Sequence, residues 1–349
     1  MTLWFFLIGL ATASFALCAW AFRALPREEW QFVAALPTDK RDDGSWSGRN
    51  LTYYGVFTAN AYLVAAVLAL LLLGALGLGR PQILILTGLL LVLCIPAASL
   101  LARWVEGKAN TLTVGGAAFV GMLAAPWLVL LVLHLMPEAT TQPPATALLA
   151  VIGIAYAFGE GLGRLACISF GCCYGAPIAG APSWLRPWLG RCHFVFRGAT
   201  RKSSYASDLE GVPLIPIQGI TALFYLCSGL AAAALLFAGR PAAAFLLAVF
   251  GTQGWRVASE WLRADERGRG RLSAYQWMAL ATLPYAVLCC LFLPAAPLPA
   301  LDLARGAGLL WSPGTILVLQ GLWFAIFLHT GRSRVTGSTV AFHVHHECI

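Results

Sequence analysis

Two pairs of opposite charges lie inside long apolar stretches of the sequence. Glu160 and Arg164 form one pair, and Arg256 and Glu260 form the other. Each pair has i,i+4 spacing, which on a helix places both side chains on one face, one turn apart. An ionisable residue in a membrane span costs about 2.5–3.5 kcal/mol on insertion scales, so charges kept there indicate function. Two arginines on two helices can each grip phosphate oxygens with paired hydrogen bonds, which predicts a site for lipid phosphate.

Neighbouring residues support this prediction without excluding a structural alternative. Gly159, Gly161 and Gly163 form a ridge without side chains, which allows a backbone or a lipid headgroup to approach closely. Arg263 extends the second charged stripe by a further turn. The alternative is that both pairs are self-satisfied ion pairs that only make the helices insertable.

Cysteines follow the first charged pair and raise the question of a metal site. Cys172 and Cys173 are adjacent, and Cys192 and His193 come later in the same polar segment. Zinc sites usually space their cysteines by two to four residues, and adjacent residues rarely bind one ion. The histidines within 343–346 are typical of a solvated tail. We therefore expect no metal and no other cofactor.

The elements that carry these residues are predicted to be membrane helices. The chain has 349 residues, of which 59% are hydrophobic and 11% charged, whereas about 25% are charged in an ordinary soluble domain. This composition excludes a soluble enzyme. An all-α, polytopic transmembrane bundle of about nine spans is expected, because nine runs approach the ~20 residues that cross a bilayer. The runs are 3–22, 53–78, 82–102, 112–136, 145–167, 214–237, 242–262, 274–295 and 309–330.

Two polar stretches, 23–52 and 168–213, interrupt the apolar runs. The second mixes tryptophans with arginines, a combination that favours the membrane–water boundary. It is long enough for a small extramembrane head over the mouth of the bundle. A structureless connector is the alternative.

Basic residues give the chain a formal net charge of +8. Eighteen of the 23 follow odd-numbered runs, and three (Arg80, Arg240 and Arg305) follow even-numbered runs. The positive-inside rule then places the side that bears 168–213 in the cytoplasm. Anionic membrane lipids are the expected partner of these charges. No nucleic-acid-binding signature is present, so no nucleic-acid partner is expected.

Several of these residues resemble a family, the bacterial prolipoprotein diacylglyceryl transferases. Gly163-Arg164, with the glycines that follow, is similar to the family's Gly-Arg signature. The stretch from Arg256 through Glu260 to Arg263 resembles its Arg-x-x-x-Glu-Phe-x-Arg segment. Three shorter matches follow the family's order: Tyr54-Gly55, Gly115-Gly116 and Pro216-Ile217-Gln218.

The resemblance implies a division of the chain and a reaction. Residues 53–295 would be a seven-span core with the head at 168–213, while 1–52 would add a span and a polar loop, and 296–349 a span and a tail. The family transfers the diacylglyceryl group of phosphatidylglycerol to the lipobox cysteine of a prolipoprotein at the bacterial inner membrane. This implies a head outside the cytoplasm, against the basic-residue count.

Roles for individual residues follow from the same resemblance. Arg164 and Arg256 would hold the phosphate, and Glu260 or Glu160 would act as base, because a carboxylate in a dry cavity can gain basicity. Further substrate-binding residues would be Tyr54, Gly115, Gly163, Cys172, Gln218 and Arg263. Cys172 as a nucleophile is a further alternative.

Departures from the family pattern keep other functions open. Val114 replaces a histidine that is a candidate base in the family, Cys167 and Cys172 replace an asparagine and a glutamate, and Thr252 replaces a tyrosine. These changes favour a related phospholipid-dependent transferase with a different acceptor. If the ion pairs are structural, a non-catalytic lipid-binding protein is the third candidate.

Overall fold

Long helices occupy the apolar runs in the computed structural model of the chain, and the expected all-α class is confirmed. The structure describes residues 1–106, 113–136, 142–181, 183, 186–264, 272–294, 296–341 and 347. Its α-helices are α1 Thr2–Ala24, α2 Tyr53–Ala75, α3 Arg80–Glu106, α4 Val114–Leu135, α5 Ala145–Phe170, α6 Arg186–Arg191, α7 Lys202–Ser207, α8 Ile217–Phe237, α9 Pro241–Ser259, α10 Ala274–Phe292, α11 Leu303–Leu310 and α12 Pro313–Gly331.

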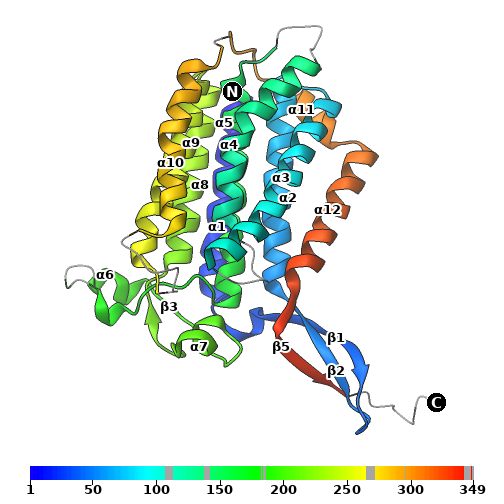
Figure 1. The fold of residues 1–349 in the computed structure, drawn as a ribbon, viewed down its shortest axis with the longest axis vertical. Coiled ribbons are helices and arrows are strands. Elements are labelled where there is room, and N and C mark those ends of the chain that lie inside the picture. Colours follow the sequence, from blue (N-terminus) through cyan, green and yellow to red (C-terminus); the bar gives the residue numbers. More distant parts are fainter. Residues whose placement is uncertain are drawn as a thin grey trace.

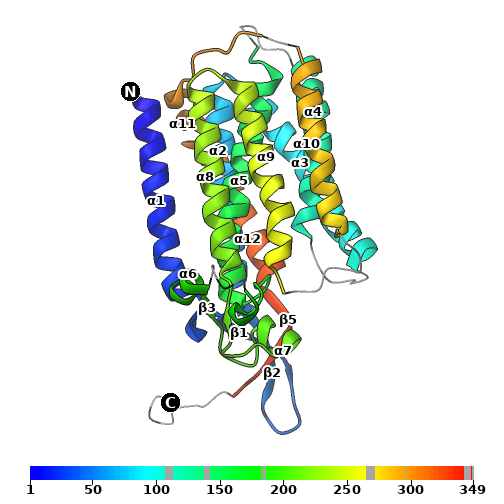
Figure 2. The same cartoon turned by 90° about the vertical axis from the view of Figure 1, so that its left-hand side faces the viewer.

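Eight of these helices are long and apolar enough to cross a membrane: α1, α2, α3, α4, α5, α8, α10 and α12. Helix α9 runs lengthwise beside them and packs between α8 and α10 (Figures 1 and 2). It is less apolar because Thr252, Gln253 and Arg256 occupy its last turns. Successive long helices run in opposite directions, so that the N-terminus and strand β5 (Arg332–Val340) lie at opposite ends (Figure 1). The chain is thus a multi-pass membrane protein.

Helix α5 lies at the centre of the bundle and packs against α2, α8 and α9. In its most apolar stretch 78% of the residues are buried, against 17% in α1 and 6% in α12. Burial on all sides removes lipid as a neighbour. Polar side chains on α5 must therefore be satisfied by one another, by other helices or by a bound ligand.

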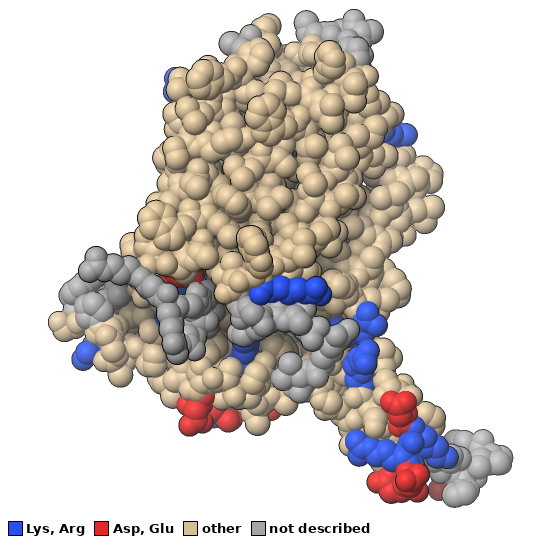
Figure 3. Space-filling view, in the orientation of Figure 1, with Lys and Arg blue, Asp and Glu red and all other residues tan. Residues whose placement is uncertain are grey.

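The outer surface of the bundle is apolar. Large hydrophobic side chains such as Phe5, Val92, Trp127 and Leu317 are well exposed on the outer helices. In Figure 3 the lengthwise helices show a wide band with few charged residues, while charges gather below it. Such a band is typical of a surface that faces hydrocarbon.

The head expected at 168–213 is present between α5 and α8. Besides α6 and α7 it contains the turn η2 (Ile178–Gly180) and a small antiparallel pair, β3 (Phe194–Val195) with β4 (Pro213–Leu214). The buried Arg201 attaches it to the bundle. Its guanidinium donates to the carbonyl oxygens of Ile168 and Ser169 in α5 and of Pro26 and Arg27 after α1.

A three-stranded antiparallel sheet, not predicted from the sequence, lies on the same side as the head (Figure 1). Strands β1 (Phe32–Lys40) and β2 (Trp46–Thr52) follow η1 (Glu28–Trp30), and β5 follows α12. Strand β2 lies in the middle and pairs with both others. The segments before α2 and after α12, which appear in the sequence as a polar loop and a tail, thus form one element.

Candidate functional site

The two charged residues of α5 lie on one face of the helix together with a tyrosine and a cysteine. Tyr156, Glu160, Arg164 and Cys167 follow one another at spacings of four, four and three residues, which keeps them on one stripe. With a rise of about 1.5 Å per residue, the stripe extends about 16 Å toward the head. Ala- and Leu-rich sequence on the other faces buries the helix around this stripe.

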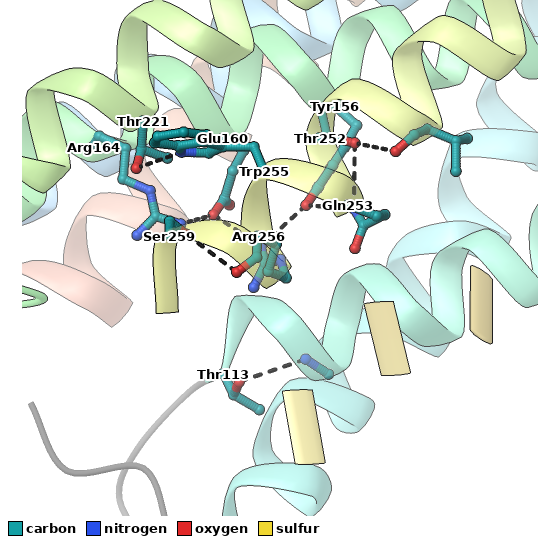
Figure 4. Close-up of polar contacts among 12 residues, drawn as sticks. Thr113, Tyr156, Glu160, Arg164, Thr221, Thr252, Gln253, Trp255, Arg256 and Ser259 are labelled. Carbon is teal, nitrogen blue, oxygen red and sulfur yellow. Dashed lines mark hydrogen bonds and ion pairs between the residues drawn. The ribbon is translucent and has the colours of Figure 1, made fainter. Parts of the chain in front are cut away.

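Glu160 joins the two arginines that the sequence singles out. Its Oε1 atom accepts a hydrogen bond from Nη2 of Arg164, one turn along α5, and from Nη2 of Arg256 in α9 at 3.1 Å. The Glu160 side chain is 7% exposed, and those of Arg164 and Arg256 are 12% and 9% exposed. Figure 4 shows both guanidinium groups directed toward this one carboxylate. Two positive charges thus meet one negative charge, which leaves this cluster with an excess of one positive charge.

The site leaves hydrogen-bond donors unused. The Nε atoms of Arg164 and Arg256 are buried and have no hydrogen-bond partner among the residues that the structure describes. A buried donor without a partner costs about 1–3 kcal/mol. A guanidinium binds phosphate through neighbouring N–H groups, so these Nε atoms are the donors that a bound phosphate would use.

Helix α4 approaches Arg256 through Gly115. A Cβ atom at this position would lie 2.9 Å from Nη1 of Arg256 and 3.0 Å from the ring of Tyr275. Any side chain here would displace the guanidinium, which gives a physical reason for a glycine at this point. The Thr113 hydroxyl caps the helix by accepting from Gly116 N (Figure 4).

Tyr156 is a member of the site that the sequence did not reveal. Its hydroxyl accepts hydrogen bonds from Nη2 of Arg256 at 3.1 Å and from Nε2 of Gln253 at 3.4 Å. The sequence feature that could have identified Tyr156 is its four-residue spacing from Glu160, which places both side chains on one face of a helix. Trp255 supports α9 from the other side, because its Nε1 donates to Thr221 at 3.0 Å and its ring stacks on Phe224.

Arg256 and Glu260 do not form the i,i+4 ion pair that their spacing suggests. Both salt bridges found within the described residues end on Glu160, so Arg256 pairs across helices and not along its own. Glu260 starts the 3-10 turn η3 (Glu260–Leu262), where α9 ends, and has interactions of its own. Arg263 follows, and its main chain forms an isolated antiparallel β-bridge with Gly175, which connects the end of α9 to the head.

The predicted glycine ridge lies in helix contacts. A Cβ at Gly159 would be 3.0 Å from Ala65, and one at Gly163 would be 3.9 Å from Ala61, both in α2. Gly161 faces α8, with the carbonyl oxygen of Ala222 at 3.2 Å from such an atom. The ridge therefore serves close packing of α5 against two neighbours rather than approach of a headgroup.

The remaining predicted substrate-binding residues gather where α5 ends. The Tyr54 ring packs edge-on against Phe170, the last residue of α5, at 5.9 Å between centroids. Gln218, 1% exposed at the start of α8, donates from Nε2 to the Cys172 carbonyl oxygen at 3.0 Å. Hydrogen bonding with Cys167 and Cys173 raises the pKa of the Cys172 thiol well above its ordinary value, and burial adds to this.

The cysteines are arranged differently from what their spacing suggests. The sulfur atoms of Cys167, Cys172 and Cys173 all lie within 4.8 Å of one another. Cys192, by contrast, is exposed, and His193 contacts the Leu189 carbonyl oxygen at 3.2 Å. The histidines within 343–346 lie outside the described residues.

Comparison with known proteins gives no identity to this arrangement. No family model matches the chain, and no curated protein matches it. The fold and the site define a multi-pass helical membrane protein in which two arginines share a buried carboxylate.

Proposed function

We propose that the protein is a membrane transferase that moves the diacylglyceryl group of phosphatidylglycerol to the lipobox cysteine of a prolipoprotein in the bacterial inner membrane. The observation that carries this proposal is the meeting of Arg164 and Arg256 on Glu160, with the Nε donors of both arginines unused. The resemblance of the charged spans to the prolipoprotein diacylglyceryl transferases supports the same assignment.

The depth of the site suits a lipid phosphate. Arg164 lies six residues before the end of α5, and Arg256 lies three residues before the end of α9. At about 1.5 Å per residue, these positions are about 9 Å and about 5 Å from the head-side ends of the helices. Measured from the helix midpoints, Arg164 and Arg256 lie about 10 Å and about 9 Å toward the head. The hydrocarbon half-thickness is about 15 Å, so with each helix centred in the bilayer both residues lie nearer the headgroup level than the midplane.

The proposed reaction assigns a role to each group. The acceptor thiol loses its proton, the sulfur forms a bond to the glyceryl carbon, and the bond between that carbon and the phosphate oxygen breaks. Glycerol phosphate leaves with the bonding electrons. Arg164 and Arg256 stabilise the charge that grows on it, as preorganised donors in a low-dielectric site do.

Glu160 and Glu260 have different roles in this proposal. Glu160 is a positioning residue, because the same oxygen accepts from both guanidinium groups. Glu260, beside the head, is the base that receives the thiol proton in this proposal.

One observation favours a second candidate, a transferase with a different acceptor. Val114, where the family has a histidine, begins α4 and is 45% exposed. A hydrocarbon side chain cannot accept a proton, so the acceptor here need not be a lipobox thiol.

A transfer assay separates the candidates. Full-length protein in nanodiscs receives phosphatidylglycerol labelled in its diacylglyceryl group and a lipobox peptide, and both peptide labelling and glycerol phosphate release are measured. The proposal is supported if wild type and Arg240→Ala label the peptide and Arg256→Ala does not. Arg240→Ala is the control because Arg240 precedes the same helix at its other end. Glycerol phosphate release without peptide labelling selects the second candidate. Binding without turnover in every variant overturns both.

The proposal also fixes an orientation. A lipobox cysteine is met at the outer leaflet, so the head and β5 would lie in the periplasm although that side bears most basic residues. Long loops translocate largely regardless of charge. A reporter fused after Ile349 is expected to be active in the periplasm, and cytoplasmic activity would contradict this orientation.

A further inference from the structure

The three clustered cysteines lie outside the phosphate site and have no part in the reaction above. Cys167 is in the last turn of α5, and Cys172 and Cys173 follow its end. Cys167 and Cys172 are each 8% exposed. Cys173 is half-buried. The arrangement is therefore a mostly buried group of three soft ligand atoms at the junction of bundle and head.

The end of α5 brings the sulfurs together. Gly171 adopts a left-handed conformation with φ 67°, and the amide of Cys172 donates to the Cys167 carbonyl oxygen at 3.1 Å. This is the hydrogen bond of a Schellman turn, which folds the chain back over the last helical turn. Cys173 is also left-handed at φ 55°, an uncommon conformation for a residue with a side chain. The turn thus places two consecutive cysteines beside a third that is five residues earlier.

The sulfur separations are close to those around a metal ion. A Zn–S bond of about 2.3 Å and tetrahedral angles separate ligand sulfurs by about 3.8 Å. The observed separations are at most 4.8 Å, so each pair has to close by no more than about 1 Å. Rotation of cysteine side chains is sufficient for such a movement.

The surroundings suit a cationic centre with one further ligand. Gln218 holds the Cys172 carbonyl through Nε2, while its Oε1 is buried without a hydrogen-bond partner among the described residues. A water molecule bound to a metal could donate to this oxygen. Arg164, one turn before Cys167, is close enough to Cys167 and Cys173 for electrostatic interaction.

We propose that Cys167, Cys172 and Cys173 form a binding site for a thiophilic divalent cation of the zinc type, completed by one water molecule. Thiolates select such ions over hard cations such as Mg²⁺. The proposal replaces our expectation from the sequence that no metal is bound. It does not depend on the transferase function.

Metal uptake by the full chain tests the site. Reduced, metal-free protein in nanodiscs is titrated with Zn²⁺ against a chelating dye, without any activity measurement. Wild type is expected to bind one Zn²⁺ per chain. Serine substitutions at Cys167, Cys172 and Cys173 should each weaken binding by about 100-fold or more, beyond the 10–100-fold that loss of an outer-shell partner causes. Cys192→Ser, which changes an exposed cysteine of the head, should bind like wild type.

A second measurement guards against variants that bind poorly because they do not fold. Cd²⁺ replaces Zn²⁺ in folded wild type, and the sulfur-to-metal charge-transfer absorbance then reports the number of thiolate ligands. Three thiolates support the site. Wild type that has three free thiols but takes up no Zn²⁺ or Cd²⁺, or in which two of the three cysteines form a disulfide, would overturn it.

Discussion

Arg201 in the head and the pair Arg164 and Arg256 in the bundle are buried arginines with different partners. Arg201 directs both Nη atoms at main-chain carbonyl oxygens of α5 and of the segment after α1. Arg164 and Arg256 instead share one carboxylate, and Arg256 also borders Gly115, which leaves space for its guanidinium. Carbonyl oxygens are fixed parts of the fold, so Arg201 connects elements, whereas the pair retains an excess charge that a mobile anion can neutralise.

The two regions also differ in how their charges are compensated. Burial lowers the pKa of Arg201 to about 10, and the charge of Glu28 opposes this shift, so the side chain keeps its charge at neutral pH. Its hydrogen bonds go to main-chain carbonyl oxygens. In the bundle, Glu160 offsets one of two positive charges. The Nε atom of Arg201 also lacks a hydrogen-bond partner among the described residues, as those of Arg164 and Arg256 do, so an unused donor alone does not separate the two regions. What separates them is that two guanidinium groups share the single carboxylate of Glu160.

The largest expected effect is on transfer by Arg256 variants. Arg256→Ala should lower the rate of phosphatidylglycerol-dependent transfer by at least about 100-fold, as loss of one preorganised donor typically does. Arg256→Lys should be nearly as defective, because a point charge does not reproduce paired contacts to phosphate. Transfer rates and melting temperatures are measured on the same preparations. Full activity with a lowered melting temperature would show that the pair is structural.

Arg201→Ala should lower stability and leave transfer unchanged, the opposite of Arg256→Ala. It leaves the carbonyl oxygens at the ends of two segments without their donor, and each buried unsatisfied group costs about 1–3 kcal/mol. The free energy of unfolding is expected to fall by about 3 kcal/mol or more, as measured by denaturant titration in detergent. Transfer per folded molecule should remain. Loss of transfer without loss of stability would remove the distinction between the two regions.

Glu160→Gln should make stability depend on anions. The substitution keeps a hydrogen-bond acceptor but leaves two buried positive charges uncompensated, which we expect to cost about 1–3 kcal/mol. Inorganic phosphate should restore about 1.4 kcal/mol when present at ten times its dissociation constant. Thermal unfolding with and without phosphate measures this. Arg201→Ala is the control, and equal rescue of that variant would show that phosphate acts elsewhere.

The smallest effect is expected in the sheet. Asp43 Oδ1 accepts from the amide and hydroxyl of Ser45 in the β1–β2 turn, and these bonds lower its pKa below 3.8. The carboxylate therefore supports the turn above its ordinary pKa, and this support is lost as the pH falls through the lower folded value. Asp43→Asn should speed hydrogen exchange in the turn at pH 7 without changing transfer. The difference from wild type should vanish at a pH below the folded pKa; a difference that persists there would exclude the carboxylate as its cause.

Much of the bundle and part of the site could be predicted from sequence. Apolar runs locate the lengthwise helices because a span needs about 20 such residues. Arg164, Glu160 and Arg256 stand out because a charge inside such a run is costly. Tyr156 does not stand out in this way, since a tyrosine is tolerated in an apolar helix.

Contacts between distant segments could not be predicted in the same way. The i,i+4 spacing of Arg256 and Glu260 shows that both side chains lie on one face of a helix, but it does not specify which helix that face contacts. The ion pair between Arg256 and Glu160 in α5 therefore could not be predicted. The thiol cluster depends on left-handed conformations at Gly171 and Cys173, which no periodicity reports. Strand β5 pairs with β2 across most of the chain, beyond the reach of local patterns.

The pairing of β5 with β2 constrains the order in which the protein is assembled. The β1–β2 hairpin is local and can form as soon as it emerges, but β5 is synthesised after every lengthwise helix. The hydroxyl of Thr52 reaches the Gly331 carbonyl oxygen at 2.8 Å, so closure occurs at the ends of α2 and α12. An α12 inserted backwards would place β5 across the bilayer and leave β2 with an open edge, which other chains can pair with. The closed sheet thus marks a chain whose last helix has the correct direction.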